Sequence, residues 1–247
     1  MTRGLFAAAV FVIAAQVYAQ PADDAARLAE FKAFAAKYRT EHSVLSLSYA
    51  IVKDGRIVAA EGFGWQDHDA EERTTADTSY LVASITKTFT GATLLAMDAD
   101  EVIDLDAREG EGRFMASPLP NPEMNASSGI IASARSLAEY SLALDQGRIL
   151  ARPLLEQMWT PPNDPDGRPA SYACGWWTQQ WRGQPLVWHS GNWPDAYAGL
   201  LLKVPRKGLT LVALGNTDGL NWDNRVQVAE VEKLPLALKF LELFAQN

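Results

Sequence analysis

The chain has 247 residues, and 48% of them are hydrophobic, which is enough for one or two ordinary globular domains. Its 30 acidic residues outnumber its 22 basic ones, and the net charge of -8 argues against nucleic acid or an anionic membrane as the partner. The single cysteine excludes an internal disulfide, and the three histidines lie too far apart for metal-ligand spacing, so we expect no metal and no other cofactor.

Residues 1–19 have the three parts of an export signal. Arg3 gives a basic start, an apolar run follows over 5–15, and Val-Tyr-Ala at 17–19 forms a small-residue cleavage site. The apolar run is too short for a membrane span. We therefore predict a periplasmic or secreted protein whose mature part, residues 20–247, is a single domain.

The first part of the mature chain predicts a helix and two strands. Apolar residues recur at helical spacing over 23–40, which is typical of a packed helix. Residues 44–52 and 56–63 flank an Asp-Gly turn and predict a pair of strands. The polar, acidic stretch that continues to Thr78 has little to bury, and we expect it to run over the surface.

The stretch 80–97 changes from an apolar run to a helical pattern at Ser84-Ile-Thr-Lys87. Residues at spacing i, i+3 share a helix face, so the Lys87 amine can reach the Ser84 hydroxyl in the first turn, where unpaired N–H groups favour negative charge. The residues after Lys87 are small and apolar and predict a buried helix. A lysine there is costly unless it is paired or its pKa falls, and a low pKa suits a general base. Alternatively, Ser84 is an ordinary N-cap and Lys87 a solvated side chain.

The next segments predict a loop and two helices. Residues 107–125 are rich in Gly, Pro, Glu and Asn, which indicates a loop. Ser133 is placed as the N-cap of a helix, and a second, short helix is predicted over 154–159. A further loop covers 160–169.

The last third predicts strands and a closing helix. Strand-like runs cover 175–181, 186–189, 197–204 and 209–215. Cys174, beside this first run, is interpreted as a small core residue of a buried strand rather than a nucleophile. Apolar residues over 224–245 predict a helix that Pro235 bends or divides. Strands from both ends of the chain are expected to share one sheet, with the terminal helices packed on it.

Three motifs in order resemble those of the serine beta-lactamase and penicillin-binding-protein superfamily. They are Ser84-Ile-Thr-Lys87, the segment from Gly129-Ile-Ile to Ala138, and His189-Ser-Gly191 before a strand hairpin that ends at Asn216. The most similar branch contains class C beta-lactamases, D-alanyl-D-alanine carboxypeptidases and family VIII esterases. The resemblance implies an α+β fold of the beta-lactamase/transpeptidase type, in which N- and C-terminal helices flank an antiparallel sheet.

The resemblance also implies a role for each site residue. Ser84 would attack a carbonyl carbon and become acylated, while Lys87 takes or relays its proton. His189, Ser190 and Gly191 would form the third motif, usually Lys-Thr-Gly, in its His-x-Gly form, and Gly191 would let the strand approach the substrate. The backbone N–H groups of Ser84 and Asn192 would form the oxyanion hole. Alternatively, His189 is only a partly buried polar tip.

One motif of this group is missing. Its members carry Tyr-x-Asn in a long helical region before the Gly-Ile-Ile segment; the tyrosine assists proton transfer and the asparagine holds the substrate. No Tyr-x-Asn occurs in this chain, and Ser84 and Gly129 are too close in sequence for the whole helical region. Tyr140 is assigned to the core, and nothing in the spacing directs Tyr172 or Tyr197 at Ser84, so we expect none of them to replace the motif.

Two functions follow from these motifs. In the first, the protein is a serine hydrolase with an acyl-enzyme on Ser84, and its partner is a small-molecule or peptide substrate: a beta-lactam, a D-Ala-D-Ala peptide or a small ester. A reduced, open cleft would favour small esters. In the second, the protein is a catalytically impaired relative that binds cell-wall peptide or another ligand without turnover.

Overall fold

The computed structural model describes residues 22–67, 69, 71–105, 125–164, 166–220 and 229–246. The predicted export signal at 1–19 lies outside the described residues. So does nearly all of the loop predicted at 107–125.

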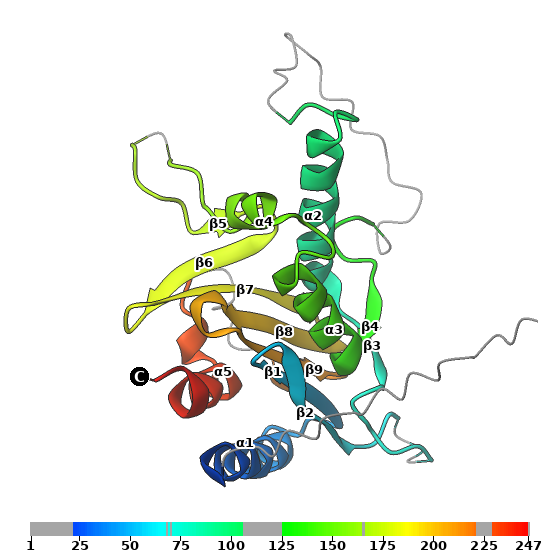
Figure 1. The fold of residues 1–247 in the computed structure, drawn as a ribbon. Coiled ribbons are helices and arrows are strands. Elements are labelled where there is room, and N and C mark those ends of the chain that lie inside the picture. The colour runs from blue at the N-terminus through cyan, green and yellow to red at the C-terminus, as the bar shows by residue number, and fades with distance from the viewer. Residues whose placement is uncertain are drawn as a thin grey trace, which may run out of the picture.

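A seven-stranded antiparallel sheet forms the centre of the molecule, in the order β2-β1-β9-β8-β7-β6-β5 (Figure 1). Within it β1 pairs with β9, which places Tyr49 opposite Ala213, so the prediction of one sheet shared by both ends of the chain is confirmed. Between β1 and β2, Asp54 and Gly55 both have positive φ, as a tight hairpin turn requires. The strands are β1 (Ser46–Lys53), β2 (Arg56–Gly64), β5 (Tyr172–Ala173), β6 (Trp176–Trp181), β7 (Gln184–Trp193), β8 (Tyr197–Val204) and β9 (Leu209–Gly215).

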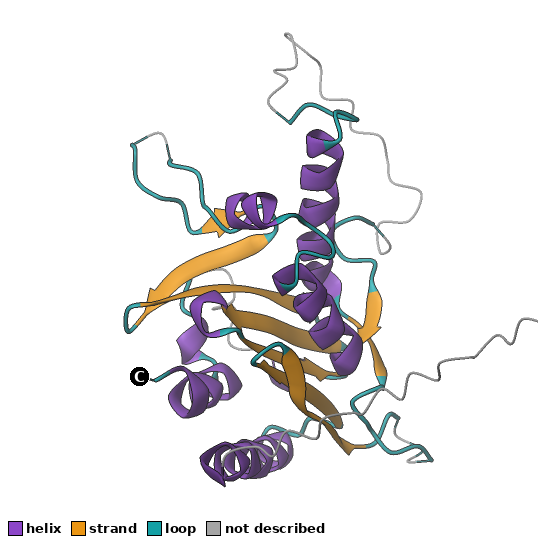
Figure 2. Ribbon diagram, viewed as in Figure 1, coloured by secondary structure: helices purple, strands orange, loops and turns teal. Residues whose placement is uncertain are grey.

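Helices cover both faces of the sheet (Figure 2). On one face lie α1 (Ala22–Glu41), α5 (Pro235–Phe240) and the π-helical turn Leu241–Ala245, with Phe31 of α1 packed edge-on against Tyr49 and Phe240. On the other face lie α2 (Thr86–Ala99), α3 (Ala134–Asp145) and α4 (Arg152–Met158). In the described part of the chain, no helix has the length and hydrophobicity needed to cross a membrane.

The closing helix is divided at Pro235, as predicted. A 3₁₀ turn, Val231–Lys233, ends at the extended residue Leu234, and α5 begins with Pro235 in its first turn. Proline is tolerated there because its missing N–H has no partner in a first helical turn. Residues 224–228 of the predicted helix lie outside the described residues.

The helix α2 is less buried than the sequence suggests. Thr88, Ala92 and Leu95 face the core, but Leu94 is 40% exposed. The prediction of a buried helix therefore holds for the face toward the core and is wrong for the face that carries Leu94. Figure 1 shows the reason: α2 starts at the sheet and rises away from it, so the sheet can cover only its first turns.

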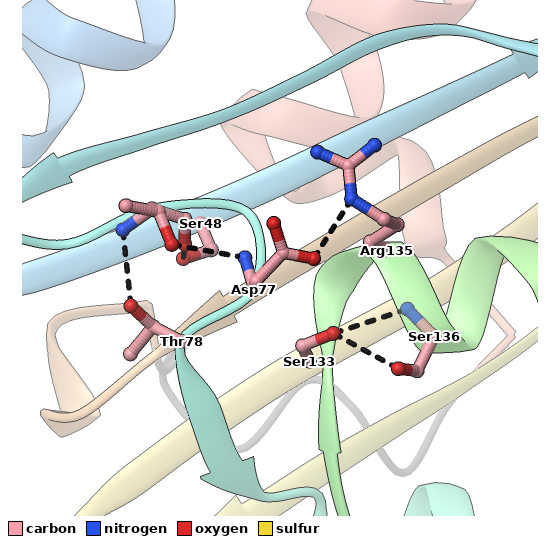
Figure 3. Close-up of polar contacts among 7 residues, drawn as sticks. Ser48, Asp77, Thr78, Ser133, Arg135 and Ser136 are labelled. Atoms are coloured by element: carbon pink, nitrogen blue, oxygen red, sulfur yellow. Dashed lines mark hydrogen bonds and ion pairs between the residues drawn. The ribbon is translucent and has the colours of Figure 1, made fainter.

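A second, two-stranded sheet leads the chain to Ser84, and the sequence did not predict it. It pairs β3 (Ser79–Leu81) with β4 (Ile131–Ser133). Ser133 caps α3 as predicted, since its Oγ accepts the Ser136 N–H at 3.1 Å (Figure 3). In the same view Arg135, at the start of α3, pairs with Asp77 at 2.7 Å, which ties the chain before β3 to α3.

The stretch before β3 is also more buried than predicted. Thr74, Ala76 and Thr78 are all less than a tenth exposed, so the expectation of a wholly superficial loop is wrong at these positions. The cause is a hydrogen bond that sequence patterns do not reveal. The Thr74 hydroxyl donates to Ser46 Oγ at 2.8 Å, which draws the loop onto β1.

Candidate active site

Ser84 and Lys87 lie together where the chain enters α2. Ser84 is in a 3₁₀ turn, Ala83–Ile85, directly before the helix, and not in the first α-helical turn as predicted. The Lys87 Nζ lies 2.7 Å from Ser84 Oγ, and it also donates to the Ser127 carbonyl oxygen at 3.1 Å. Both side chains are half-buried, and burial lowers the pKa of Lys87. A neutral amine at this distance can accept the hydroxyl proton.

The backbone before Ser84 is strained. Ala83 has φ 45°, in the left-handed region that residues with a side chain avoid. Its neighbour Val82 is held by a hydrogen bond from its N–H to the Ile130 carbonyl at 3.0 Å. Strain of this kind persists only where surrounding contacts enforce it, and it concentrates at functional sites.

Gly191 brings strand β7 against this turn. A Cβ atom added to Gly191 would lie 2.1 Å from the Val82 carbonyl oxygen, so only glycine permits the contact. The close approach at Gly191 is therefore to the backbone of the Ser84 turn. The motif residues 189–192 lie beside Ser84 as a result.

Residues 189–193 of β7, which include the motif, form an open strand edge on one side. β6 pairs with β7 only as far as Trp177 opposite Trp188, whereas β8 continues along β7 to Tyr197 opposite Trp193. Among the described strands, none pairs with residues 189–193 on the β6 side. A free strand edge of this kind can hydrogen-bond the backbone-like amide or ester of a ligand.

His189 is buried and bonded at both ring nitrogens. Its Nδ1 contacts the Ser190 carbonyl oxygen, and its Nε2 lies 2.9 Å from the Tyr172 hydroxyl. Because a carbonyl only accepts, Nδ1 carries the proton and Nε2 accepts from Tyr172. Burial lowers the pKa of His189 to about 4, and the charge of Lys87 adds to this, so the ring is neutral near pH 7. The interpretation of His189 as a partly solvated tip is wrong, since the residue is only 6% exposed.

The remaining motif residues lie on the same strand. Ser190 is buried and supplies the carbonyl that His189 contacts. The side-chain oxygen of Asn192 is buried and has no hydrogen-bond partner among the described residues. Three or more His, Cys, Asp or Glu side chains do not gather into a metal-binding group anywhere in the described ranges.

Tyr172 is the site residue that the sequence reasoning missed. Its hydroxyl contacts His189, and its side chain lines a cavity that Lys87 also lines. Tyr172 and His189 are 17 positions apart and meet because β5 and β7 flank β6, which no spacing rule reveals. Tyr140 is a core residue, as predicted: its ring stacks on Phe89 and its hydroxyl donates to the Thr88 carbonyl at 3.0 Å.

The cavity has a volume of about 600 Å³. Its walls come from α2, from the segment 125–127 and from the turn after β5, and Lys87 is the charged residue among them. Asn125 shapes this segment by accepting hydrogen bonds from the Ser127 N–H at 2.8 Å and hydroxyl at 2.6 Å. The lining residues are Lys87, Thr90, Gly91, Leu94, Asn125, Ala126, Ser127, Tyr172, Cys174 and Gly175.

Cys174 lies in the turn between β5 and β6. It is exposed and has φ 39°, so its interpretation as a core residue of a buried strand is wrong. The turn packs tightly on α2: a Cβ at Gly91 would lie 2.1 Å from the Cys174 carbonyl oxygen, and a Cβ at Gly175 2.2 Å from the Lys87 carbonyl oxygen. Partial burial raises the pKa of the Cys174 thiol, which keeps it protonated.

Comparisons with known proteins identify the family of the chain. The beta-lactamase family model matches residues 31–111 and 108–233 of the chain. The chain belongs to the beta-lactamase family. The resemblance found in the sequence motifs is thereby confirmed, and the two matched stretches overlap at 108–111.

Relatives of known sequence match parts of this family member. The Unguisins hydrolase ungD' of Aspergillus campestris is 26% identical over 56% of the chain and 31% of its own length. Protein flp of Staphylococcus aureus is 36% identical over 24% of the chain and 12% of its own length. The chain thus spans less than a third of the length of these curated relatives.

Solved structures confirm the α+β beta-lactamase fold. The octameric penicillin-binding protein homologue from Pyrococcus abyssi superposes with a TM-score of 0.69 at 17% identity, over 89% of this chain and 78% of its own. D-amino acid amidase from Ochrobactrum anthropi gives 0.65 at 12% identity, over 89% and 100%. The class C beta lactamase from Rhodobacter sphaeroides gives 0.64 at 12% identity, over 90% and 99%. At these identities the likeness concerns the fold alone.

Proposed function

We propose that this member of the beta-lactamase family is a serine hydrolase that forms an acyl-enzyme on Ser84 and acts on small, uncharged esters. The observation that carries the proposal is the 2.7 Å contact between Lys87 Nζ and Ser84 Oγ in a half-buried site. Export from the cytoplasm is part of the proposal, because residues 1–19 have the pattern of an export signal.

The chemistry begins with proton transfer. Lys87 in its neutral form, which burial favours by lowering its pKa, takes the Ser84 proton as the Oγ attacks the carbonyl carbon of the ester, and collapse of the tetrahedral intermediate releases the alcohol. The backbone N–H groups of Ser84 and Asn192 are the proposed donors to the oxyanion. Water then attacks the acyl-enzyme and releases the acid.

The charge of the site favours esters over carboxylate-bearing substrates. Lys87 is the charged group among the described residues of the cavity wall, and its nitrogen is committed to Ser84 and Ser127. His189 is neutral near pH 7. Among the described residues of this apolar cavity, no free cation would lie beside the carboxylate of a beta-lactam or a D-Ala-D-Ala peptide, and burying an unpaired carboxylate is costly.

Binding without turnover is the second candidate function. One observation favours it: the second contact of the Lys87 amine is a backbone carbonyl at Ser127, which cannot carry a proton in place of the missing tyrosine. In that case the protein would bind a ligand at the open edge of β7 and release it unchanged.

Steady-state hydrolysis separates these functions. We expect turnover of p-nitrophenyl butyrate that Ser84→Ala abolishes, with much slower hydrolysis of a chromogenic cephalosporin. Ser171→Ala, which alters an exposed serine, is the matched control and should behave like the wild type. A wild-type protein that binds the ester but does not release p-nitrophenol would instead support the binding function, and a preference for the cephalosporin would contradict the substrate class.

A further inference from the structure

The cavity beside Ser84 contains a second proton-bearing group that neighbouring residues hold in place. When an ester acylates Ser84, the departing alkoxide needs a proton, and Lys87 is held at Ser84 Oγ, the attacking atom. Among the described titratable groups beside the cavity, His189 offers no proton to it, because Nδ1–H is bonded to the Ser190 carbonyl and Nε2 is an acceptor. Tyr172 and Cys174 remain; Cys174 is exposed in the turn after β5, whereas a hydrogen bond to His189 holds Tyr172.

The Tyr172 hydroxyl is positioned by contacts on two sides. It donates to His189 Nε2 at 2.9 Å, and its ring packs edge-on against Trp177 with centroids 5.0 Å apart. Its side chain lines the same cavity as Lys87 while coming from a different wall. Burial raises the pKa of Tyr172 to about 12, so the phenol keeps its proton near pH 7.

We propose that Tyr172 is a catalytic residue that gives its hydroxyl proton to the leaving alcohol. In this step the O–H turns from His189 Nε2 to the leaving oxygen, and His189 is the residue that holds the phenol in place before the reaction. This role rests on the proposed ester hydrolysis at Ser84. Tyr172 would supply, from β5, the proton-transfer group that the missing Tyr-x-Asn motif would otherwise have contributed.

The proton balance of the step is complete. The Ser84 Oγ–carbon bond forms, and the Ser84 proton passes to Lys87. The bond between the carbonyl carbon and the leaving oxygen breaks, and that oxygen takes the Tyr172 proton. The Lys87 ammonium then returns its proton to the Tyr172 phenolate within the shared cavity. The products are the acyl-enzyme and a neutral alcohol, and both residues regain their starting states.

Two esters of one acid test the proposal. Ethyl butyrate releases an alkoxide that needs a proton, whereas p-nitrophenyl butyrate releases a phenolate that is stable without one. In Tyr172→Phe we expect kcat/KM for the ethyl ester to fall on the order of 10²-fold or more, the usual effect of lost general acid catalysis. The value for the p-nitrophenyl ester should change little. Because kcat/KM reports the steps through acylation, the shared deacylation step does not enter the comparison.

The control is Tyr140→Phe, which also removes one buried hydroxyl, here bonded to the Thr88 carbonyl. It should affect the two esters equally or not at all. An equal loss for both esters in Tyr172→Phe would overturn the proposal and make Tyr172 a structural residue, and so would unchanged kinetics with both. Wild-type hydrolysis of the p-nitrophenyl ester establishes the proposed function independently of Tyr172, whereas its absence would remove both proposals.

Replacement of Tyr172 by 3-fluorotyrosine keeps the ring in place if the phenylalanine variant does not fold. Fluorine lowers the phenol pKa, so the alkaline limb of the kcat/KM profile should move to lower pH for the ethyl ester and not for the p-nitrophenyl ester. The groups that face Tyr172, namely His189, Cys174 and Lys87, are common to both profiles. An alkaline limb that stays in place for the ethyl ester would contradict the proposed role.

Discussion

His189 illustrates how burial sets the protonation state of a single residue in this site. It is 6% exposed, and its pKa falls to about 4 from an ordinary value of 6.5. Between about pH 4 and pH 6.5, His189 therefore binds a proton in the unfolded chain but not in the folded chain. Stability is fully present above the higher value and decreases as pH falls toward the lower one.

We predict a loss of up to about 3 kcal/mol of unfolding free energy from this residue over that range, since one pKa unit corresponds to about 1.4 kcal/mol. Urea denaturation of the wild type and of His189→Gln at several pH values measures the effect. The variant should lose less stability than the wild type as pH falls. Parallel curves would show that His189 does not titrate as described.

At the residue scale the sequence predicts what is local and misses what is distant. The Ser84 and Lys87 contact follows from helical spacing alone, and the structure agrees at 2.7 Å. Tyr172 could not be found in this way, because its contact with His189 depends on the order of β5, β6 and β7 in the sheet. Cys174 was misplaced because a turn with positive φ follows the short strand β5, and its tryptophan neighbours resemble a continuous buried strand.

At the scale of elements, β7 can contact the Ser84 turn only because residue 191 is a glycine, which has no side chain. In Gly191→Ala the new methyl would overlap the Val82 carbonyl, so the strand or the turn must move. We predict destabilisation of about 1–3 kcal/mol, as for other overpacked cores, together with loss of ester hydrolysis.

Gly208→Ala is the matched control for this prediction. It lies in the β8–β9 turn at φ 58°, where no atom would lie within 4 Å of the added methyl. Its backbone strain should lower stability by about 1–2 kcal/mol and leave hydrolysis intact. Thermal denaturation and kcat/KM measured on both variants check the pair. Full activity in folded Gly191→Ala would contradict the close approach.

Another element contact is a buried ion pair between the sheet and α3. Lys203 of β8 is 1% exposed, and its Nζ donates to Asp145 at 2.9 Å and to Thr210 at 3.2 Å. Asp145→Ala leaves this charge buried without its partner, and we expect a loss of about 3 kcal/mol.

Lys203→Met should lower the free energy of unfolding by clearly less than Asp145→Ala does. The substitution removes the buried charge, so no unpaired charge is left in the core. The hydroxyls of Ser141 and Thr210 still bond each other at 2.8 Å, and Asp145, whose side chain is 29% exposed, can be solvated. Chemical denaturation of the two variants gives the comparison. A larger loss in Lys203→Met than in Asp145→Ala would be evidence against this account of the ion pair.

The sequence predicted the regular elements better than the irregular ones. The N-terminal helix and strands β1, β2, β8 and β9 lie close to their predicted bounds, because each has a clear period and clear turn residues. The small sheet of β3 and β4 was missed, since its strands are three residues long and pair across a wide gap in sequence. The sequence also does not predict the exposed face of α2, because the small and apolar residues of this helix are typical of a helix that is buried on all sides.

For the whole molecule, the order of motifs along the chain was enough to identify the family and the fold. The sheet and its two helical layers are those of the family fold, and the structures compared above superpose over most of the chain. What remains is a half-buried Ser84 and Lys87 pair, an open strand edge and a cavity walled partly by Tyr172. The sequence could predict that a motif was absent but not that Tyr172 would contact His189 beside the same cavity.

The central claim is that Lys87 makes Ser84 nucleophilic, and the rate at which a fluorophosphonate probe modifies Ser84 tests it most directly. Intact mass spectrometry with peptide mapping should find one adduct, on Ser84, in the wild type and none in Ser84→Ala. Lys87→Arg keeps the charge but cannot accept a proton, so the probe should modify Ser84 in this variant on the order of 10²-fold more slowly than in the wild type, or not at all. An adduct in Ser84→Ala, no adduct in the wild type, or an unchanged rate in Lys87→Arg would contradict the account.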